Sequence, residues 1–136
     1  MEIAAIHWLE ANGYDVCHLA GVDSDRRGAE LLNHKAYPSV GHDEYWAGPQ
    51  RANVEAARAA GVHLAFWSGN EIFWKTRHEC GTVTTDGSPT TYQTLVCYKE
   101  TRDDRILDPG DPPTCTCTWR TRVSVRRETP DALKTR

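Results

Sequence analysis

The stretch PQRANVEAARAAGVHLAFW, residues 49–67, decides the fold of this chain. Pro49 suits the first turn of a helix, and Gly61 suits the residue that ends one. VHLAFW, residues 62–67, follows as an almost entirely apolar run, which predicts a strand buried on both faces. A helix followed directly by such a strand is typical of a parallel sheet that helices cover on both sides.

The flanking sequence predicts the same alternation of helices and strands. Before this stretch we expect four elements, in the order helix, strand, helix and strand, over residues 3–13, 14–19, 23–35 and 36–40. After it, residues 68–74 are expected to form a loop or the start of a helix. The DG turn signal and the β-branched residues within 82–100 predict two more strands.

Length and charge limit the classes of protein to which the chain can belong. With 136 residues we expect one α/β domain over residues 1–120, followed by a basic, unpatterned tail over residues 121–136. A net charge of −3 gives no basis for binding nucleic acid or an anionic membrane. No apolar run comes close to the length of about 18 residues that a helix needs to span a bilayer. We therefore expect a cytoplasmic protein without nucleic-acid or membrane partners.

Five cysteines, with no C-x-x-C pair, do not form the pattern of a disulfide framework. Cys17 and Cys97 lie in apolar runs, and we expect them to be small buried side chains. Cys115 and Cys117 form a C-x-C, which would contribute to a zinc site only if two more ligands came from elsewhere.

Two segments rich in polar and aromatic residues follow expected strands: GHDEYW, residues 41–46, and SGNEIFW, residues 68–74. In parallel sheets ligands bind at the carboxyl ends of the strands, so these segments are where chemistry is expected. The second segment offers backbone N–H groups and the Asn70 amide to a developing oxyanion. An ordinary strand-to-helix turn has the same local composition.

The first segment carries four polar side chains in a row. In one interpretation His42 and Tyr45 line a pocket, and Glu44 or Asp43 orients them. In the other, one of these side chains caps the helix that starts near Pro49 and the rest are solvated. Phenolate and carboxylate oxygens are hard donors that suit a ferric ion.

Glu100 ends the apolar run TLVCYKE, and Tyr98 comes two residues before it. In a strand these two side chains face the same way. Together they could hold a metal ion, or they could mark the exposed end of a strand.

Five segments in this order carry a resemblance to a known family: WLEANGYDV, GVDSDRRG, LLNHKAYPSVGHDEYW, QRANVEAARAAGVHLAFWSGNEIFWKTR and TLVCYKE. Residues 2–120 resemble the C-terminal domain of the large (beta) subunit of N,N-dimethylformamidase. The resemblance implies a flavodoxin-like, class I glutamine-amidotransferase-like fold, a three-layer α/β sandwich with a mostly parallel sheet.

The resemblance also implies a reaction and a metal. The characterised member hydrolyses a small tertiary amide to formate and an amine, with a mononuclear iron held by two tyrosines and one glutamate. Carried over, Tyr45 and Glu100 are the expected iron ligands, and His42, Glu44, Asn70 and Tyr98 are the expected catalytic residues. Tyr98 stands where relatives are expected to have a histidine. The expected partners are a small amide and either a second copy of the chain or a small subunit.

Departures from the family pattern favour a second hypothesis, a catalytically silent α/β domain or a fragment of a larger protein. Ile3 stands where relatives carry a tyrosine that is the other expected iron ligand. The SGNE loop lacks the nucleophilic cysteine usual in this fold. A suitable choice of codons from Arg120 onward gives the family's pattern in another reading frame, so we hypothesise that a frameshift precedes Thr121 and that the tail is out of frame. We also expect the chain to lack an upstream strand.

Overall fold

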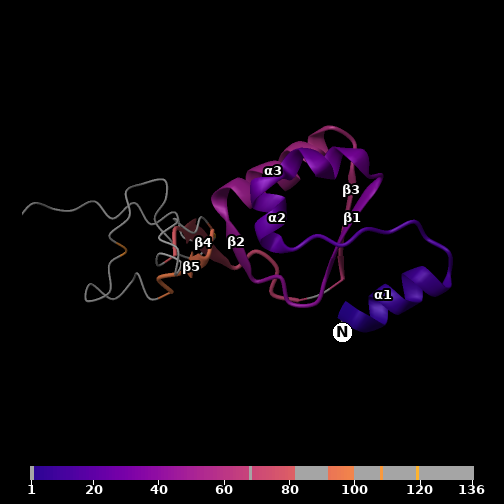
Figure 1. Cartoon of the computed structure of the whole chain (residues 1–136), viewed down its shortest axis with the longest axis horizontal. Coiled ribbons are helices and arrows are strands. Elements are labelled where there is room, and N and C mark those ends of the chain that lie inside the picture. Colours follow the sequence, from indigo (N-terminus) through magenta and orange to yellow (C-terminus); the bar gives the residue numbers. More distant parts are fainter. Residues whose placement is uncertain (1, 68, 82–91, 100–107, 109–118, 120–136) are drawn as a thin grey trace, which may run out of the picture.

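The computed structural model describes residues 2–67, 69–81, 92–99, 108 and 119 (Figure 1). Its elements are, in order, α1 (Glu2–Ala11), α2 (Gly21–Arg26), the 3-10 helix η1 (Gly28–Asn33), β1 (Ala36–Val40), β2 (Tyr45–Ala47), α3 (Gly48–Ala59), β3 (His63–Trp67), β4 (Trp74–Glu79) and β5 (Thr94–Val96). The chain therefore has the predicted α/β architecture, with small and mostly parallel sheets. Within the described residues, no helix is long and apolar enough to cross a membrane.

The strands form two parallel pairs that interleave along the chain, because the first strand pairs with the third and the second with the fourth. β1 pairs with β3 from Ala36 opposite His63, and β2 pairs with β4 from Tyr45 opposite Trp74. The partner of Ala36 lies 27 positions further along the chain, and that of Tyr45 lies 29. The connection between β3 and β4 is therefore two residues longer than the one between β1 and β2. β5 adds to β4 in the antiparallel direction.

α3 and β3 form where the sequence predicts them. The prediction that the strand is buried on both faces is wrong, because among the described residues β3 pairs with β1 alone, and Phe66 and Trp67 are 41% and 45% exposed. Val54 and Ala57 lie on the buried face of α3, and Val62 follows at the start of the strand. The buried cluster consists of these three residues with Leu31 and Trp46. α3 packs against α2 and η1. Because α3 connects β2 to β3, this core also holds the two strand pairs in place.

Two local predictions are wrong. Residues 14–19 form no strand, because among the described residues β1 pairs with β3 alone and offers them no ladder. Residues 23–35 form no single helix either. Arg27, at φ −129° and ψ 38°, breaks the helical backbone, and α2 and η1 lie on either side of it.

Strands β2 and β4 were not predicted. Each polar segment therefore follows one strand and leads directly into another. β5 confirms one of the two strands expected within residues 82–100. The other falls on residues 82–91, outside the described part of the chain. The tail at 121–136 and the C-x-C at Cys115 and Cys117 lie outside it as well.

α1 forms as predicted but packs loosely. It has no buried residue, and Ile3 and Trp8 are 68% and 54% exposed. In Figure 1, α1 lies on the opposite side of the β1–β3 pair from α2 and α3. The space between α1 and β1 is a pocket rather than a packed layer.

Candidate functional site

The two polar segments meet between the strand pairs. The backbone N–H of Ile72 donates to the carbonyl of Asp43 at 3.0 Å, and those of Phe73 and Trp74 donate to the carbonyl of Glu44 at 3.0 and 2.8 Å. Three hydrogen bonds thus join residues 41–44 to residues 69–74. Side chains that are about thirty positions apart in sequence are brought to one place by these bonds.

Ser39 lies at the centre of this region and is 4% exposed. Its hydroxyl donates to Asp43 Oδ2 at 2.8 Å, and Glu71 Oε2 lies 3.4 Å from the same oxygen. A hydroxyl has one proton to donate, so the shorter contact is the stronger bond. Two carboxylates therefore converge on one buried hydroxyl, which makes the site acidic.

Tyr37 lies two positions earlier on the same strand, and its pKa is sensitive to these negative charges. Burial raises the pKa of its phenol to about 12, and the negative charges of Asp43 and Glu71 act in the same direction. The phenol is therefore neutral at ordinary pH and available as a hydrogen-bond donor.

Tyr45, the expected metal ligand, begins β2 and is 36% exposed. Its hydroxyl is hydrogen-bonded to the Lys99 ammonium, which also lies 4.6 Å from the centre of the Tyr45 ring. The hydrogen bond to Tyr45 raises the pKa of Lys99, with smaller contributions from nearby acidic groups such as Glu44. The phenol oxygen thus faces a cation in this structure. Glu100, the other expected ligand, follows Lys99 in sequence and lies outside the described residues.

Of the other expected catalytic residues, Asn70 and Glu44 lie on the two loops, whereas Tyr98 follows β5 and lies beside β4. Asn70 is exposed, with φ at +62°, a left-handed conformation that asparagine tolerates better than most residues. Glu44 is half-buried and uses its backbone carbonyl to hold the second loop. Tyr98 is half-buried too, and the Arg77 guanidinium lies 5.9 Å from its ring centre.

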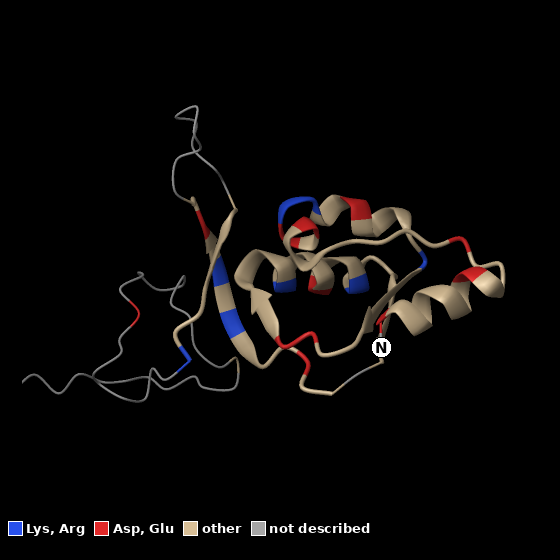
Figure 2. Ribbon diagram, turned by 60° about the horizontal axis from the view of Figure 1, so that its bottom comes forward, with Lys and Arg blue, Asp and Glu red and all other residues tan. Residues whose placement is uncertain are grey.

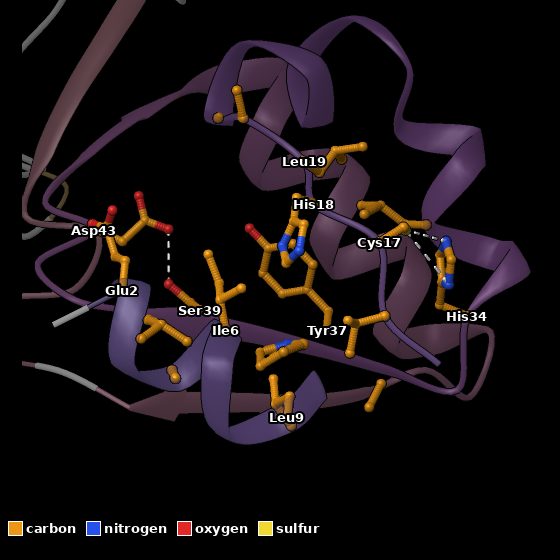
Figure 3. Close-up of a pocket in the computed structure, with 18 of the residues that line it drawn as sticks. Glu2, Ile6, Leu9, Cys17, His18, Leu19, His34, Tyr37, Ser39 and Asp43 are labelled. Carbon is orange, nitrogen blue, oxygen red and sulfur yellow. Dashed lines mark hydrogen bonds between the residues drawn. The ribbon is translucent and has the colours of Figure 1, made fainter. Parts of the chain in front are cut away.

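A pocket of about 460 Å³ opens beside these loops, between α1, residues 15–21 and β1 (Figure 3). His42 and Asp43 line it from the first loop, together with Tyr37 and Ser39 from β1. Tyr45 does not belong to its lining. Ile3 does not either, although its neighbour Glu2 does.

The sequence interpretation missed three side chains of this region. Ser39 is a polar residue within the apolar run AYPSV, and a buried hydroxyl at such a position is a signal that could have been used. Tyr37 gave a weaker signal, since tyrosine is common in strands. Lys99 could not be found from its neighbours in sequence, because its contact with Tyr45 spans 54 positions.

No curated protein matches the chain, and no solved structure matches it. Within the described residues, no group of three or more His, Cys, Asp and Glu side chains is placed to hold a metal ion. The family model described as N,N-dimethylformamidase beta subunit-like, C-terminal, matches residues 1–133. Because this match covers nearly the whole chain, the chain belongs to the N,N-dimethylformamidase beta subunit-like family.

Proposed function

We propose that this domain contributes to hydrolysis of the C–N bond of a small amide, as an amidase of the dimethylformamidase type. Membership of the family supports the reaction class. The observation that carries the proposal is the junction of residues 41–44 with residues 69–74, which places His42 and Asp43 at the edge of the pocket and joins their loop to the one that carries Asn70. We also propose the flavodoxin-like, glutamine-amidotransferase-like fold and a cytoplasmic location.

The residues at the junction have complementary roles in this proposal. His42, at the pocket edge, exchanges protons with water and with the departing amine nitrogen. Glu44 orients the neighbouring side chains and adds a negative charge to the loop. Asn70 donates its amide N–H to the oxygen that becomes negative during attack. Tyr98 supplies a phenol as a hydrogen-bond donor near the reacting carbonyl.

Tyr45 and Glu100 are the proposed ligands for a mononuclear iron. Their oxygens are hard donors, the type that a ferric ion prefers, so the chemistry of the donor set fits. Iron bound there would act as a Lewis acid toward the amide carbonyl. Lys99 opposes this ligation in the structure, because its ammonium is hydrogen-bonded to the Tyr45 hydroxyl. Lys99 must release this hydroxyl before the phenol can become a ligand.

Iron analysis and a visible spectrum of the purified chain test the metal part of this proposal. We expect iron to bind with a tyrosinate-to-iron absorption band, and Tyr45→Phe to abolish the band. Lys99→Met is expected to increase iron uptake, because it removes the competing cation. Tyr14→Phe, which changes an exposed tyrosine that stacks on Trp8 of α1, is the matched control. A band that survives Tyr45→Phe would contradict the assignment of this ligand.

Release of formate from N,N-dimethylformamide, and of amines from a panel of small amides, tests the reaction. His42→Ala and Asn70→Ala are each expected to lower kcat by about 100-fold, the usual effect of removing a proton-transfer or oxyanion group. The assay is made on the chain alone and after mixing with a small partner subunit, because the proposal includes association with such a subunit or with a second copy. Iron-loaded chain that hydrolyses no amide in either state would overturn the proposed function.

A further inference from the structure

The prediction that Cys17 is buried is wrong, and its exposure makes its thiol accessible to reagents. The apolar run around it predicts a small buried side chain, but the structure has an exposed free thiol. The reason is that residues 14–20 form no strand and cross the open side of β1 instead. Cys17 thereby lines the pocket between α1 and β1 (Figure 3).

His34 lies beside this thiol although it is 17 positions away in sequence. Cys17 Sγ is 3.2 Å from His34 Nε2 and 4.0 Å from Nδ1, so the thiol faces one specific ring nitrogen. His34 follows the last residue of η1, where its backbone N–H donates to the Leu31 carbonyl at 3.3 Å. That bond holds the imidazole at the pocket wall, with the buried Leu31 as its anchor.

A second histidine in the same pocket provides an internal comparison. His18 follows Cys17 in sequence, but its Nε2 lies 3.7 Å from Glu10 Oε1. Its imidazole therefore faces α1, while His34 faces the thiol. The arrangement of a nucleophile within hydrogen-bond reach of one positioned base is the general requirement for thiol activation.

We propose that Cys17 and His34 form a modification site that takes up low-molecular-weight disulfides by thiol–disulfide exchange. His34 Nε2 accepts the Cys17 thiol proton, and the resulting sulfur attacks one sulfur of the small disulfide. A new S–S bond joins Cys17 to half of the reagent, the original S–S bond breaks, and the released thiolate takes up a proton. The disulfide is the oxidant, so electrons and atoms balance without any further reactant.

The pocket has the size and the lining for the attached group. It holds about 460 Å³, and Leu9 and Leu19 give it apolar walls beside the polar Tyr37. His42 and Asp43 line the same space, so a group attached to Cys17 lies in the pocket that these two residues border. Modification of Cys17 would then obstruct access to them.

The experiment uses the full chain and oxidised glutathione as the probe, with mass spectrometry of tryptic peptides. Cys17 is the sole cysteine of the peptide over residues 1–26, so its modification is read separately from that of the other cysteines. Cys80 is also exposed, and the structure records no histidine contact for its thiol among the described residues. We expect Cys17 to form the mixed disulfide at least about tenfold faster than Cys80 in the same tube.

Two variants separate activation from mere exposure. His34→Gln is expected to lower the rate at Cys17 by about tenfold or more, because it removes the base. His18→Gln, the matched control in the same pocket, is expected to change that rate by less than about twofold. Equal rates for Cys17 and Cys80 in the unaltered chain would overturn the proposal without any variant. An unchanged rate in a folded His34→Gln chain would overturn it as well.

Discussion

At the residue scale, Tyr37 is the side chain whose ionisation the fold opposes. Its pKa rises from 10.0 to about 12 on burial, and Asp43 and Glu71 contribute through their negative charges. The unfolded chain releases this proton near pH 10, but the folded chain keeps it until about pH 12. The contribution of Tyr37 to stability is therefore complete below pH 10 and is lost as the pH rises toward 12.

Titration of the tyrosinate absorbance in the near ultraviolet tests this assignment. Tyr37→Phe is expected to remove a component that titrates near pH 12. Tyr14→Phe, at an exposed position, is the control. A Tyr37→Phe chain that loses a component near pH 10 instead would show that the phenol is not shielded.

Trp46 is the largest side chain of the core, and it is 1% exposed. Trp46→Ala is expected to lower the free energy of unfolding by about 3–5 kcal/mol, because it leaves a cavity among the residues that pack on α3. Trp8→Ala, on the exposed face of α1, is expected to change it by less than about 0.5 kcal/mol. Urea denaturation followed by circular dichroism measures both. Similar losses for the two variants would contradict the described core.

At the scale of elements, one side chain of α3 is hydrogen-bonded to the backbone of α2. Asn53 Nδ2 donates to the backbone carbonyls of Ser24 and Asp25 at 2.8 and 2.9 Å. These carbonyls lie in the last turn of α2, where intrahelical partners are missing. Gly28 leaves room for this contact, because a Cβ there would lie 2.1 Å from Asn53 Cγ.

Gly28→Ala is therefore expected to destabilise the fold by more than about 1 kcal/mol, since it displaces Asn53 from both carbonyls. Gly48→Ala is the matched control: Gly48 begins α3, and a Cβ there has no atom within 4 Å. Alanine at that position is expected to be neutral or slightly stabilising. Thermal unfolding of the two variants decides the matter, and an equal melting temperature would rule out the clash.

The elements that the sequence could predict are those whose signals are local. α3 and β3 carry local signals, an early proline, a terminal glycine and an apolar run, and they were found. β4, the stretch WKTRHE, has few apolar residues, and its pairing with β2 and β5 decides its conformation. Residues 14–19, in contrast to β4, have the composition of a strand but, within the described part of the chain, no neighbouring strand with which to pair. Pairing partners are not encoded locally, so both errors have one cause.

The candidate site was predictable to a similar extent. GHDEYW and SGNEIFW were chosen because they follow expected strands, and they do meet through backbone hydrogen bonds. The contacts of individual side chains were not predictable, because Lys99 and Glu71 reach the site from distant positions. The assignment of Tyr45 and Glu100 as iron ligands stays a prediction, and so does the out-of-frame tail.

At the scale of the whole molecule, Arg77 joins β4 to residue 108. Its Nη1 lies 2.6 and 2.5 Å from the two carboxylate oxygens of Asp108, whose side chain is 2% exposed. Arg77 Nε also donates to Glu79 Oε1 at 2.6 Å, but Glu79 is 46% exposed. The bond to Asp108 is the main cause that raises the pKa of Arg77. Figure 2 shows basic residues along β4, to which Arg77 and Lys75 belong.

Asp108→Asn is expected to cost about 1.5–3 kcal/mol, because, of the two charged partners that Arg77 has within the described residues, it removes the buried one and leaves only the exposed Glu79. Glu79→Gln removes a partner of the same arginine at an exposed position, and the expected loss is below about 1 kcal/mol. Chemical denaturation of the two variants in parallel gives the comparison. Equal losses would mean that the Asp108 contact contributes no more than a surface ion pair.

The two-residue difference between the strand connections restricts how the length of the β3–β4 connection can change in this chain. Thr76 lies opposite Ala47, and both are 1% exposed. Because side chains alternate along a strand, a difference of two keeps Thr76 facing inward. One added residue would bring Lys75 opposite Ala47 and turn a charged side chain toward the interior. A single insertion or deletion in this connection is therefore expected to disturb the strand pairing more than a change of two residues.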